Sequence, residues 1–333
     1  MSGGRWCAQP ERGSRWIVRL GVWLTLHLGW QIGRLLLLPI TAYFYLASGP
    51  ARAASRDYLG RVLGRPAGAR DVLRHFHSFA SAILDRLFLV LNRTEAFKIE
   101  IIGLDAVDSL LAAGRGGVLL GAHLGSFEVL RAIARHCPVH VSALMYRGNA
   151  GVLTRLLEQL NPELQRQVID IGAVDAMLAV RERVEGGELV GILADRAVGA
   201  QKSLATPFLG GMAAFPAGPV MLAATLGAPV VLFCGVRTGP RRYQVHFVPF
   251  ADRITLRRGQ RIEDARLWVT RYAAQVEAWC RLYPTNWFNF FPFWETSPDA
   301  APAPRDNAVL RLGVAPSRIG ANRGRARRAV ADT

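Results

Sequence analysis

The chain has 333 residues, of which 51% are hydrophobic, and its formal net charge at pH 7 is +16. This length suffices for one large domain or two modest ones, and the charge favours partners such as nucleic acid, anionic lipid or phosphorylated ligands. No zinc-finger, RNA-binding or basic-zipper signature is present, which argues against nucleic acid. The four cysteines lack metal-like spacing, and we interpret them as reduced, small apolar residues in a cytosolic setting.

The N-terminal region, residues 1–50, is the most apolar part of the chain and predicts a hydrophobic or amphipathic membrane-anchor helix. Residues 16–47 are mostly hydrophobic, but their uninterrupted part, 35–47, is shorter than the ~20 residues that a helix needs to cross a bilayer. Tryptophans suited to the headgroup level lie, with other apolar residues, on the remaining side of the helix. An anchor that spans the membrane, an anchor in its plane and helices packed within the domain all fit this pattern. The polar residues fall on one broad side: Arg15, Arg19, His27, Gln31 and Arg34.

From residue 53 onward, helix-like and strand-like patterns alternate, which predicts an α/β fold with a mostly parallel central sheet flanked by helices. Residues 53–90 have the apolar spacing of two helices. The glycine- and proline-rich stretch 206–219 predicts a loop. Strands are predicted at 97–102, 117–120, 139–146, 168–170, 189–193, 230–236 and 243–247. Further helices are predicted at 104–113, 127–136, 149–160, 175–185, 220–226 and 261–281.

The C-terminal residues 297–333 change in composition to Ala, Pro, Arg, Gly and Asn. Such a segment cannot bury a core and predicts a basic disordered tail. This tail either touches anionic lipid or is a solvated appendage. The predicted organisation is therefore an anchor region over 1–50, one domain over 51–296 and the tail.

The stretch with the most distinctive chemistry is 118–131, VLLGAHLGSFEVLR. His123 follows an apolar strand closely, so we expect it at the carboxyl-end rim of the sheet, where sites of open α/β folds form. Ser126 is a candidate helix N-cap, and Glu128 falls in the first helical turn. We expect the His123 ring to fold back onto Glu128, whose carboxylate would fix the tautomer and leave a ring nitrogen free to accept a substrate proton. The alternative is a turn histidine beside a helix-capping acid.

In its wider context, this stretch resembles a known family, the bacterial lipid A late acyltransferases, which are lauroyl- and myristoyltransferases. His123-Leu-Gly-Ser-Phe-Glu128 is similar to the His-x4-Asp/Glu motif that this family shares with glycerolipid acyltransferases. The resemblance covers most of residues 15–296 and implies a glycerolipid-acyltransferase-like fold. Further similar segments follow in the family's order: Tyr146-Arg147 with Asn149 and Leu153, Asp195 with Gly199, Thr206-Pro-Phe-Leu-Gly210, Pro216-Ala-Gly-Pro219, 227–231 and Tyr283-Pro-Thr-Asn-Trp-Phe288.

Two features depart from the family's pattern. The middle acid of its Asp-x-Asp-x-Gly segment is replaced by Ala197, which Arg196 precedes. Residues 286–294, NWFNFFPFW, differ from the Trp-x-x-Arg-rich form usual in lipid A enzymes. Both features look more like the acyltransferases of glycolipid, aryl-polyene or flexirubin-type pathways, so the acceptor stays open between these classes.

The resemblance implies an O-acyltransferase that moves a fatty acyl chain from acyl carrier protein, or from CoA, to a hydroxyl of a membrane lipid or glycolipid. His123 would be the base, Glu128 would stabilise the imidazolium, and this chemistry needs no metal or resident cofactor. Arg147 would hold a phosphate of the acceptor or of the pantetheine arm, or else form an ordinary salt bridge.

The remaining implied site residues lie later in the chain. Asp195 would orient Arg147 or contact polar groups of the acceptor, or else cap the loop after its strand. Gly210 and Gly218 would let the backbone approach the ligand or form an oxyanion pocket, or else belong to simple turns.

The resemblance also implies a location and partners: the cytoplasmic face of the bacterial inner membrane, acyl carrier protein, a membrane lipid acceptor and an anionic membrane surface, without nucleic acid. Two other functions compete with acyl transfer. One is a non-catalytic lipid-binding protein on the same fold. The other is a hydrolase with Ser126 as nucleophile, which lacks the Gly-x-Ser-x-Gly elbow that such enzymes use.

Overall fold

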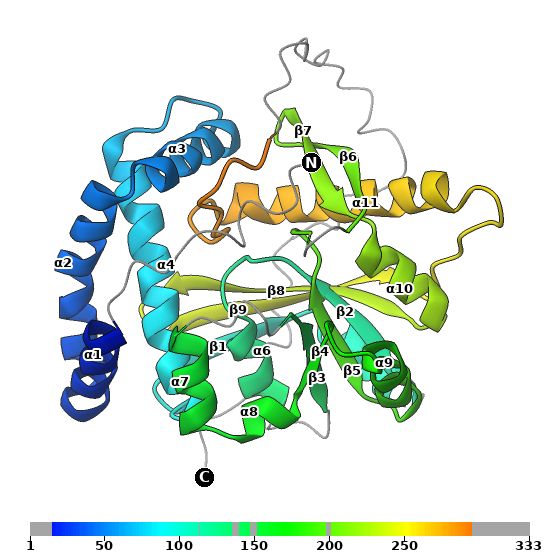
Figure 1. Ribbon diagram of the computed structural model, residues 1–333, viewed down its shortest axis with the longest axis horizontal. Coiled ribbons are helices and arrows are strands. Elements are labelled where there is room, and N and C mark those ends of the chain that lie inside the picture. The colour runs from blue at the N-terminus through cyan, green and yellow to red at the C-terminus, as the bar shows by residue number, and fades with distance from the viewer. Residues whose placement is uncertain (1–14, 113, 135–139, 147–151, 198–200, 295–333) are drawn as a thin grey trace.

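A computed structural model describes residues 15–112, 114–134, 140–146, 152–197 and 201–294 (Figure 1). It shows a central sheet with helices on both faces and a column of helices at one side. The predicted tail over 297–333 lies outside the described residues.

Seven strands form the central sheet in the order β1-β9-β8-β2-β5-β3-β4. Every neighbouring pair is parallel except β8 and β9, so the predicted α/β fold with a mostly parallel sheet is confirmed. The strands are β1 (Lys98–Ile102), β2 (Gly117–Gly121), β3 (Val141–Met145), β4 (Val168–Asp170), β5 (Leu189–Leu193), β8 (Val230–Gly239) and β9 (Arg242–Ala251).

Helices cover both faces of this sheet, because its inner strands β2, β3 and β5 are mostly apolar and buried on both sides. In β2, Val118 and Leu120 join the core cluster that includes α3, α10 and α11, whereas Leu119 joins the cluster that includes α5, α6 and α7. The helices are α1 (Arg15–Leu28), α2 (Trp30–Ala47), α3 (Gly49–Leu63), α4 (Ala69–Val90), α5 (Asp105–Ala112), α6 (Phe127–Ala134), α7 (Val152–Leu160), α8 (Glu163–Arg166), α9 (Ala176–Glu185), α10 (Gly218–Leu226) and α11 (Arg261–Leu282).

The predicted loop over 206–219 is wrong. Its residues belong mainly to an antiparallel hairpin of β6 (Ser203–Phe208) and β7 (Gly211–Pro216), and α10 begins at Gly218. The reason is burial: Phe208 and Phe215 are fully buried, and the Phe208 ring contacts the Trp287 ring at a centroid distance of 5.3 Å. This aromatic packing outweighs the local turn signal of the glycines and prolines.

The apolar N-terminal region forms two helices, α1 and α2, which Gly29 separates at a φ of 88°. On the inner side of α2, the Trp30 indole donates a 2.6 Å hydrogen bond to the buried Asp85 of α4. Within the described residues no single helix is long and apolar enough to cross a membrane, although α2 and α3 pass that test together with a bend of 96° between them. The membrane anchor therefore stays a prediction.

Candidate active site

The turn after β2, residues 122–126, lies at the carboxyl end of the sheet and is tied to its surroundings by backbone hydrogen bonds. The Gly125 N–H donates to Asn286 O at 2.8 Å, and the Ser126 N–H donates to Gly235 O at 2.8 Å. Gly125 has a φ of +76°, and a Cβ there would lie 1.8 Å from Gly235 O. Only glycine fits this position, because a side chain would collide with the β8 backbone.

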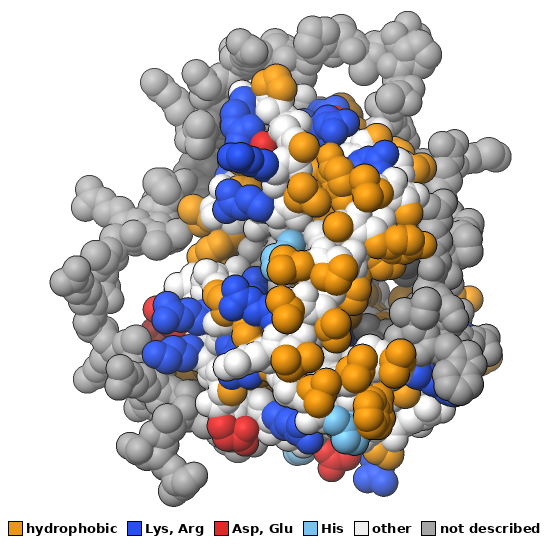
Figure 2. Space-filling view, turned by 90° about the vertical axis from the view of Figure 1, so that its left-hand side faces the viewer, with side chains coloured by type: hydrophobic (Ala, Val, Ile, Leu, Met, Phe, Trp, Pro, Cys, Tyr) orange, Lys and Arg blue, Asp and Glu red, His pale blue; other side chains and the backbone are white. Residues whose placement is uncertain are grey.

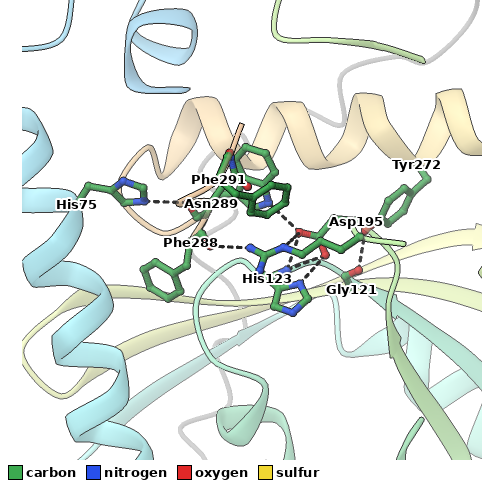
Figure 3. A network of polar contacts seen from close by, with 10 residues as sticks. His75, Gly121, His123, Asp195, Tyr272, Phe288, Asn289 and Phe291 are labelled. Carbon is green, nitrogen blue, oxygen red and sulfur yellow. Dashed lines mark hydrogen bonds and ion pairs between the residues drawn. The ribbon is translucent and has the colours of Figure 1, made fainter. Parts of the chain in front are cut away.

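His123 in this turn contacts Asp195, which follows β5 (Figure 3). The His123 Nδ1 lies 2.8 Å from Asp195 Oδ1, and the His123 backbone N–H lies 3.1 Å from both carboxylate oxygens. Their proximity follows from strand register, since β2 and β5 are parallel neighbours that pair Gly121 with Leu193, two residues before each. Asp195 was expected to orient Arg147 or to contact the acceptor; in the structure it contacts the histidine.

The expected contact between His123 and Glu128 is replaced by two others. Glu128 lies in the first turn of α6 and forms a 2.6 Å ion pair with Arg86 of α4. The Ser126 hydroxyl also donates to Glu128, at 3.3 Å. The hydrogen bond from Ser126 to Gly235 fixes the turn against β8, so the first turn of α6 directs Glu128 toward α4. Asp195 occupies the Nδ1 side of the His123 ring.

The electrostatics of the pair favour a neutral imidazole beside an ionised carboxylate. Burial lowers the pKa of His123 below its ordinary value of 6.5, and the charge of Arg196 lowers it further, whereas Asp195 acts in the opposite direction. Burial alone would raise the pKa of Asp195, but His123, Arg196 and the Trp287 indole stabilise the carboxylate and hold its pKa below its usual range. The Nδ1–H then donates to Asp195, and Nε2 is left as the proton acceptor.

His123 lies on the wall of a cavity of about 310 Å³ between α4, α6, α7 and the carboxyl ends of the strands. Most of the wall is apolar, and its titratable residues are His123, Arg86, Glu128, Arg131, Glu158 and Arg196. A mainly apolar cavity with a few polar groups is typical of a small-molecule or lipid site. Apolar wall residues include Ile83, Leu144, Leu157, Leu164, Phe233 and Phe288.

Two other predicted site residues, Gly210 and Gly218, lie away from the cavity. Gly210 is the exposed tip of the β6–β7 hairpin, and Gly218 is the first residue of α10; neither lines the cavity. Arg147 lies outside the described residues, as do Asn149 and Gly199. Their substrate-binding roles stay predictions.

Besides the contact between His123 and Asp195, three contacts of the site were not predicted from the sequence. The Trp287 indole donates a 2.9 Å hydrogen bond to Asp195 Oδ2, and the Arg196 Nη2 donates to Phe288 O at 2.6 Å. Arg86 neutralises Glu128 from another helix. The only sequence signal for Arg196 was its place directly after Asp195 at a strand end, and nothing in the sequence linked Arg86 to this site.

Comparison with known families gives a match over most of the chain. A family model described as bacterial lipid A biosynthesis acyltransferase matches residues 6–296. A comparison with curated proteins finds no match. The matched range contains every helix and strand described above, together with His123, Glu128 and Asp195.

Proposed function

The chain belongs to the family of bacterial lipid A biosynthesis acyltransferases, and on this basis we propose that it transfers a fatty acyl chain from a thioester to a hydroxyl of a membrane lipid. The observation that carries the proposal is the 2.8 Å pair of His123 and Asp195 on the wall of an apolar cavity. This pair supplies an oriented base without a protein nucleophile, which suits a reaction whose nucleophile belongs to the substrate.

In the proposed reaction, Nε2 of His123 takes the proton of the acceptor hydroxyl while the hydroxyl oxygen attacks the thioester carbonyl carbon. The carbonyl electron pair moves onto oxygen, so a tetrahedral oxyanion forms. Its collapse breaks the carbon–sulfur bond, and the His123 imidazolium returns the proton to the sulfur. Asp195 keeps the ring oriented and stabilises the imidazolium between the two transfers.

Glu128 is the second carboxylate of the proposed site. It lies on the cavity wall, and its pairing with Arg86 at 2.6 Å connects α6 to α4 there. We propose that this pair shapes the cavity and balances its charge, while Asp195 acts on the histidine directly.

The donor and acceptor are proposed from the family resemblance: acyl carrier protein first and CoA second as thioester carriers, and a lipid A-type or other glycolipid as acceptor. The apolar wall of the cavity supports an acyl chain as ligand. The departures at Arg196, Ala197 and 286–294 keep the glycolipid, aryl-polyene and flexirubin-type classes as alternatives for the acceptor.

A membrane setting is supported by the outer face of α1 and α2. Figure 2 shows hydrophobic side chains gathered on this side of the molecule, with Lys and Arg side chains beside them. We propose that this face lies in the plane of the cytoplasmic leaflet of the bacterial inner membrane, where an apolar strip beside cations is favourable. Its exposed residues include Leu20, Trp23, Leu28, Ile32, Leu35, Leu38, Tyr43 and Leu46.

The test combines a defined assay with cellular lipids. The purified chain is incubated with acyl carrier protein thioester, or with acyl-CoA, and a bacterial lipid extract, and the products are identified by mass spectrometry. We expect an acylated lipid from the wild type and none from His123→Ala, with both proteins giving the same circular dichroism. Comparison of total lipids from cells with and without the protein then identifies the acceptor.

Two outcomes would contradict the proposal. Lipid binding without transfer from either donor would indicate a non-catalytic lipid-binding protein. Release of free fatty acid that is lost in Ser126→Ala, with no acylated lipid formed, would indicate a hydrolase.

A further inference from the structure

Arg196 is a cation at the wall of the cavity directly beside His123. Its Nη2 donates to Phe288 O at 2.6 Å, and the N–H of the same Phe288 donates to His123 O at 2.9 Å, so one residue holds both. Its side chain is only 12% exposed, and its Nε is buried without a hydrogen-bond partner in the described part of the chain. A buried donor without an acceptor is uncommon in folded proteins and requires an explanation.

The backbone of the histidine turn cannot serve as the oxyanion site, because its N–H groups already have acceptors. In thioester chemistry the developing oxyanion needs donors 2.7–3.1 Å away, which backbone N–H groups often supply. The first turn of α6 already carries the Glu128 carboxylate, which opposes a second negative charge there. The N–H groups of the turn donate to Asp195, Ala122 O, Asn286 O and Gly235 O, from His123, Leu124, Gly125 and Ser126 respectively.

The other cations of the cavity are already engaged. In the part of the chain that the structure describes, three arginines line the cavity. Arg86 is held by Glu128 at 2.6 Å, and Arg131 donates from Nε to Gln167 at 3.1 Å. Arg196 has a weaker hold on its acid, since its Nε lies 3.8 Å from Asp195 Oδ2, and that carboxylate also binds His123.

We propose that Arg196 is a catalytic residue whose guanidinium binds the thioester carbonyl oxygen and stabilises the oxyanion that forms on it. This inference rests on the proposed acyl transfer. When the acceptor oxygen bonds to the carbonyl carbon, the displaced π pair becomes the negative charge that Arg196 neutralises. When the carbon–sulfur bond breaks, that pair reforms the carbonyl, and the bonding pair leaves on sulfur, which takes the proton from His123. The oxygen beside the Arg196 guanidinium is then neutral again. Such a contact is stronger in the transition state than in the ground state, which is the condition for catalysis.

Arg196 also affects the pKa of His123, the proposed base. Several titratable or charged groups face His123 or line the cavity with it, from the elements packed around this site. Burial lowers the pKa of His123 and Arg196 lowers it further, so removing Arg196 raises that pKa. The titratable or charged groups around His123 are Asp195 and Arg196 after β5, Glu128 and Arg131 on α6, Arg86 on α4 and Glu158 on α7.

The experiment compares wild type, Arg196→Gln and Arg196→Lys in the acyl-transfer assay with acyl-CoA. We expect Arg196→Gln to lower kcat about 10²- to 10³-fold, the usual effect of losing one oxyanion donor. Arg196→Lys keeps the charge and should recover part of that loss. The acid limb of the kcat–pH profile should move to higher pH in Arg196→Gln only. The affinity for an S-alkyl CoA thioether, which lacks the carbonyl oxygen, should stay unchanged.

Arg237→Gln is the matched control. Arg237 is 13% exposed and pairs with a fully buried acid, Asp85, as Arg196 pairs with Asp195, but it does not line the cavity. We expect it to lose stability with no change in kcat or in the acid limb.

Three results separate the possible failures. No transfer by the wild type, from either acyl-CoA or acyl carrier protein thioester, would refute the proposed function itself. Equal kcat in wild type and Arg196→Gln would overturn the role of Arg196 and leave the proposed function standing. A loss of thioether affinity as large as the loss of kcat, with no shift of the acid limb, would also overturn it and indicate a purely structural arginine.

Discussion

The Nδ1 of His123 and the Oδ1 of Asp195 lie 2.8 Å apart, although 72 residues separate them in the chain. Their side chains meet because each follows one of two paired parallel strands by two residues. The carboxylate is fully buried, and its other oxygen accepts the indole N–H of Trp287 at 2.9 Å. Such an arrangement fixes the imidazole in one tautomer before any substrate binds.

Substituting Asp195 should therefore cost more activity than substituting Glu128. Asp195→Asn removes the charge that stabilises the imidazolium, and we expect kcat to fall about 10²- to 10⁴-fold. Glu128→Gln leaves the His123–Asp195 contact intact, so a smaller loss is expected, through the broken pair with Arg86. Steady-state kinetics of both variants measure this order. A larger loss of kcat in Glu128→Gln than in Asp195→Asn would indicate that Glu128 is the carboxylate that acts with His123.

The acyl transfer should be lost on acidification. His123 acts as a base only when neutral, and its pKa lies below 6.5 because burial and Arg196 disfavour the imidazolium. The rate therefore rises with pH through this lowered pKa and is already near its plateau at neutral pH. The kcat/KM–pH profile of the free enzyme measures the inflection. An inflection above 6.5 would contradict the electrostatic description of the site.

The strands of the central sheet and the position of His123 were predictable because they depend on short-range patterns. The apolar run of β2 is buried on both faces, and such a run ending at a polar residue predicts a site at the strand end. The partner of His123 was not predictable in this way. It depends on β5 pairing with β2, and a sequence without known strand order allows either Glu128 nearby or Asp195 farther along the chain.

The β6–β7 hairpin also could not be predicted from the local sequence alone. Its glycines and prolines predict a loop, but Phe208 and Phe215 pack against aromatic rings of residues 287–294. Those rings lie far along the chain, so no local window contains the stabilising contacts. The contact between Arg86 and Glu128 was hidden for the same reason.

A second histidine, His75, should make the fold less stable in acid. It is fully buried between the Ser55 hydroxyl and Trp287 O, and burial lowers its pKa to about 4 from 6.5. Between these two pKa values His75 binds a proton in the unfolded chain but not in the folded one, so stability falls as pH drops from 6.5 toward 4. We expect a loss of about 2 kcal/mol between about pH 7 and about pH 5 in urea unfolding. His75→Gln should be less stable at neutral pH but should lack this part of the loss; an unchanged slope would refute the assignment.

Two glycines with similar backbones should respond differently to alanine. Gly125 and Gly210 have φ values of +76° and +75°, but a Cβ on Gly125 would lie 1.8 Å from Gly235 O, whereas one on Gly210 meets nothing within 4 Å. Gly210→Ala should cost about 1–2 kcal/mol from the backbone alone. Gly125→Ala adds overpacking and should cost about 2–5 kcal/mol. Urea unfolding measures both. Loss of acyl transfer in a stable Gly210→Ala variant would support its predicted role in substrate binding.

Charges on the outer face of α2 should release the protein from membranes. Leu35 and Leu38 are 63% and 58% exposed there, so Leu35→Glu and Leu38→Glu should leave the free energy of unfolding nearly unchanged. If this face lies in a bilayer, each change should weaken binding to vesicles of phosphatidylethanolamine and phosphatidylglycerol by up to about 3 kcal/mol. Leu267→Glu is the control, because Leu267 is 64% exposed on α11, a different helix. Vesicle flotation measures the bound fraction. Equal flotation of all three variants and the wild type would show that α2 does not contact the membrane.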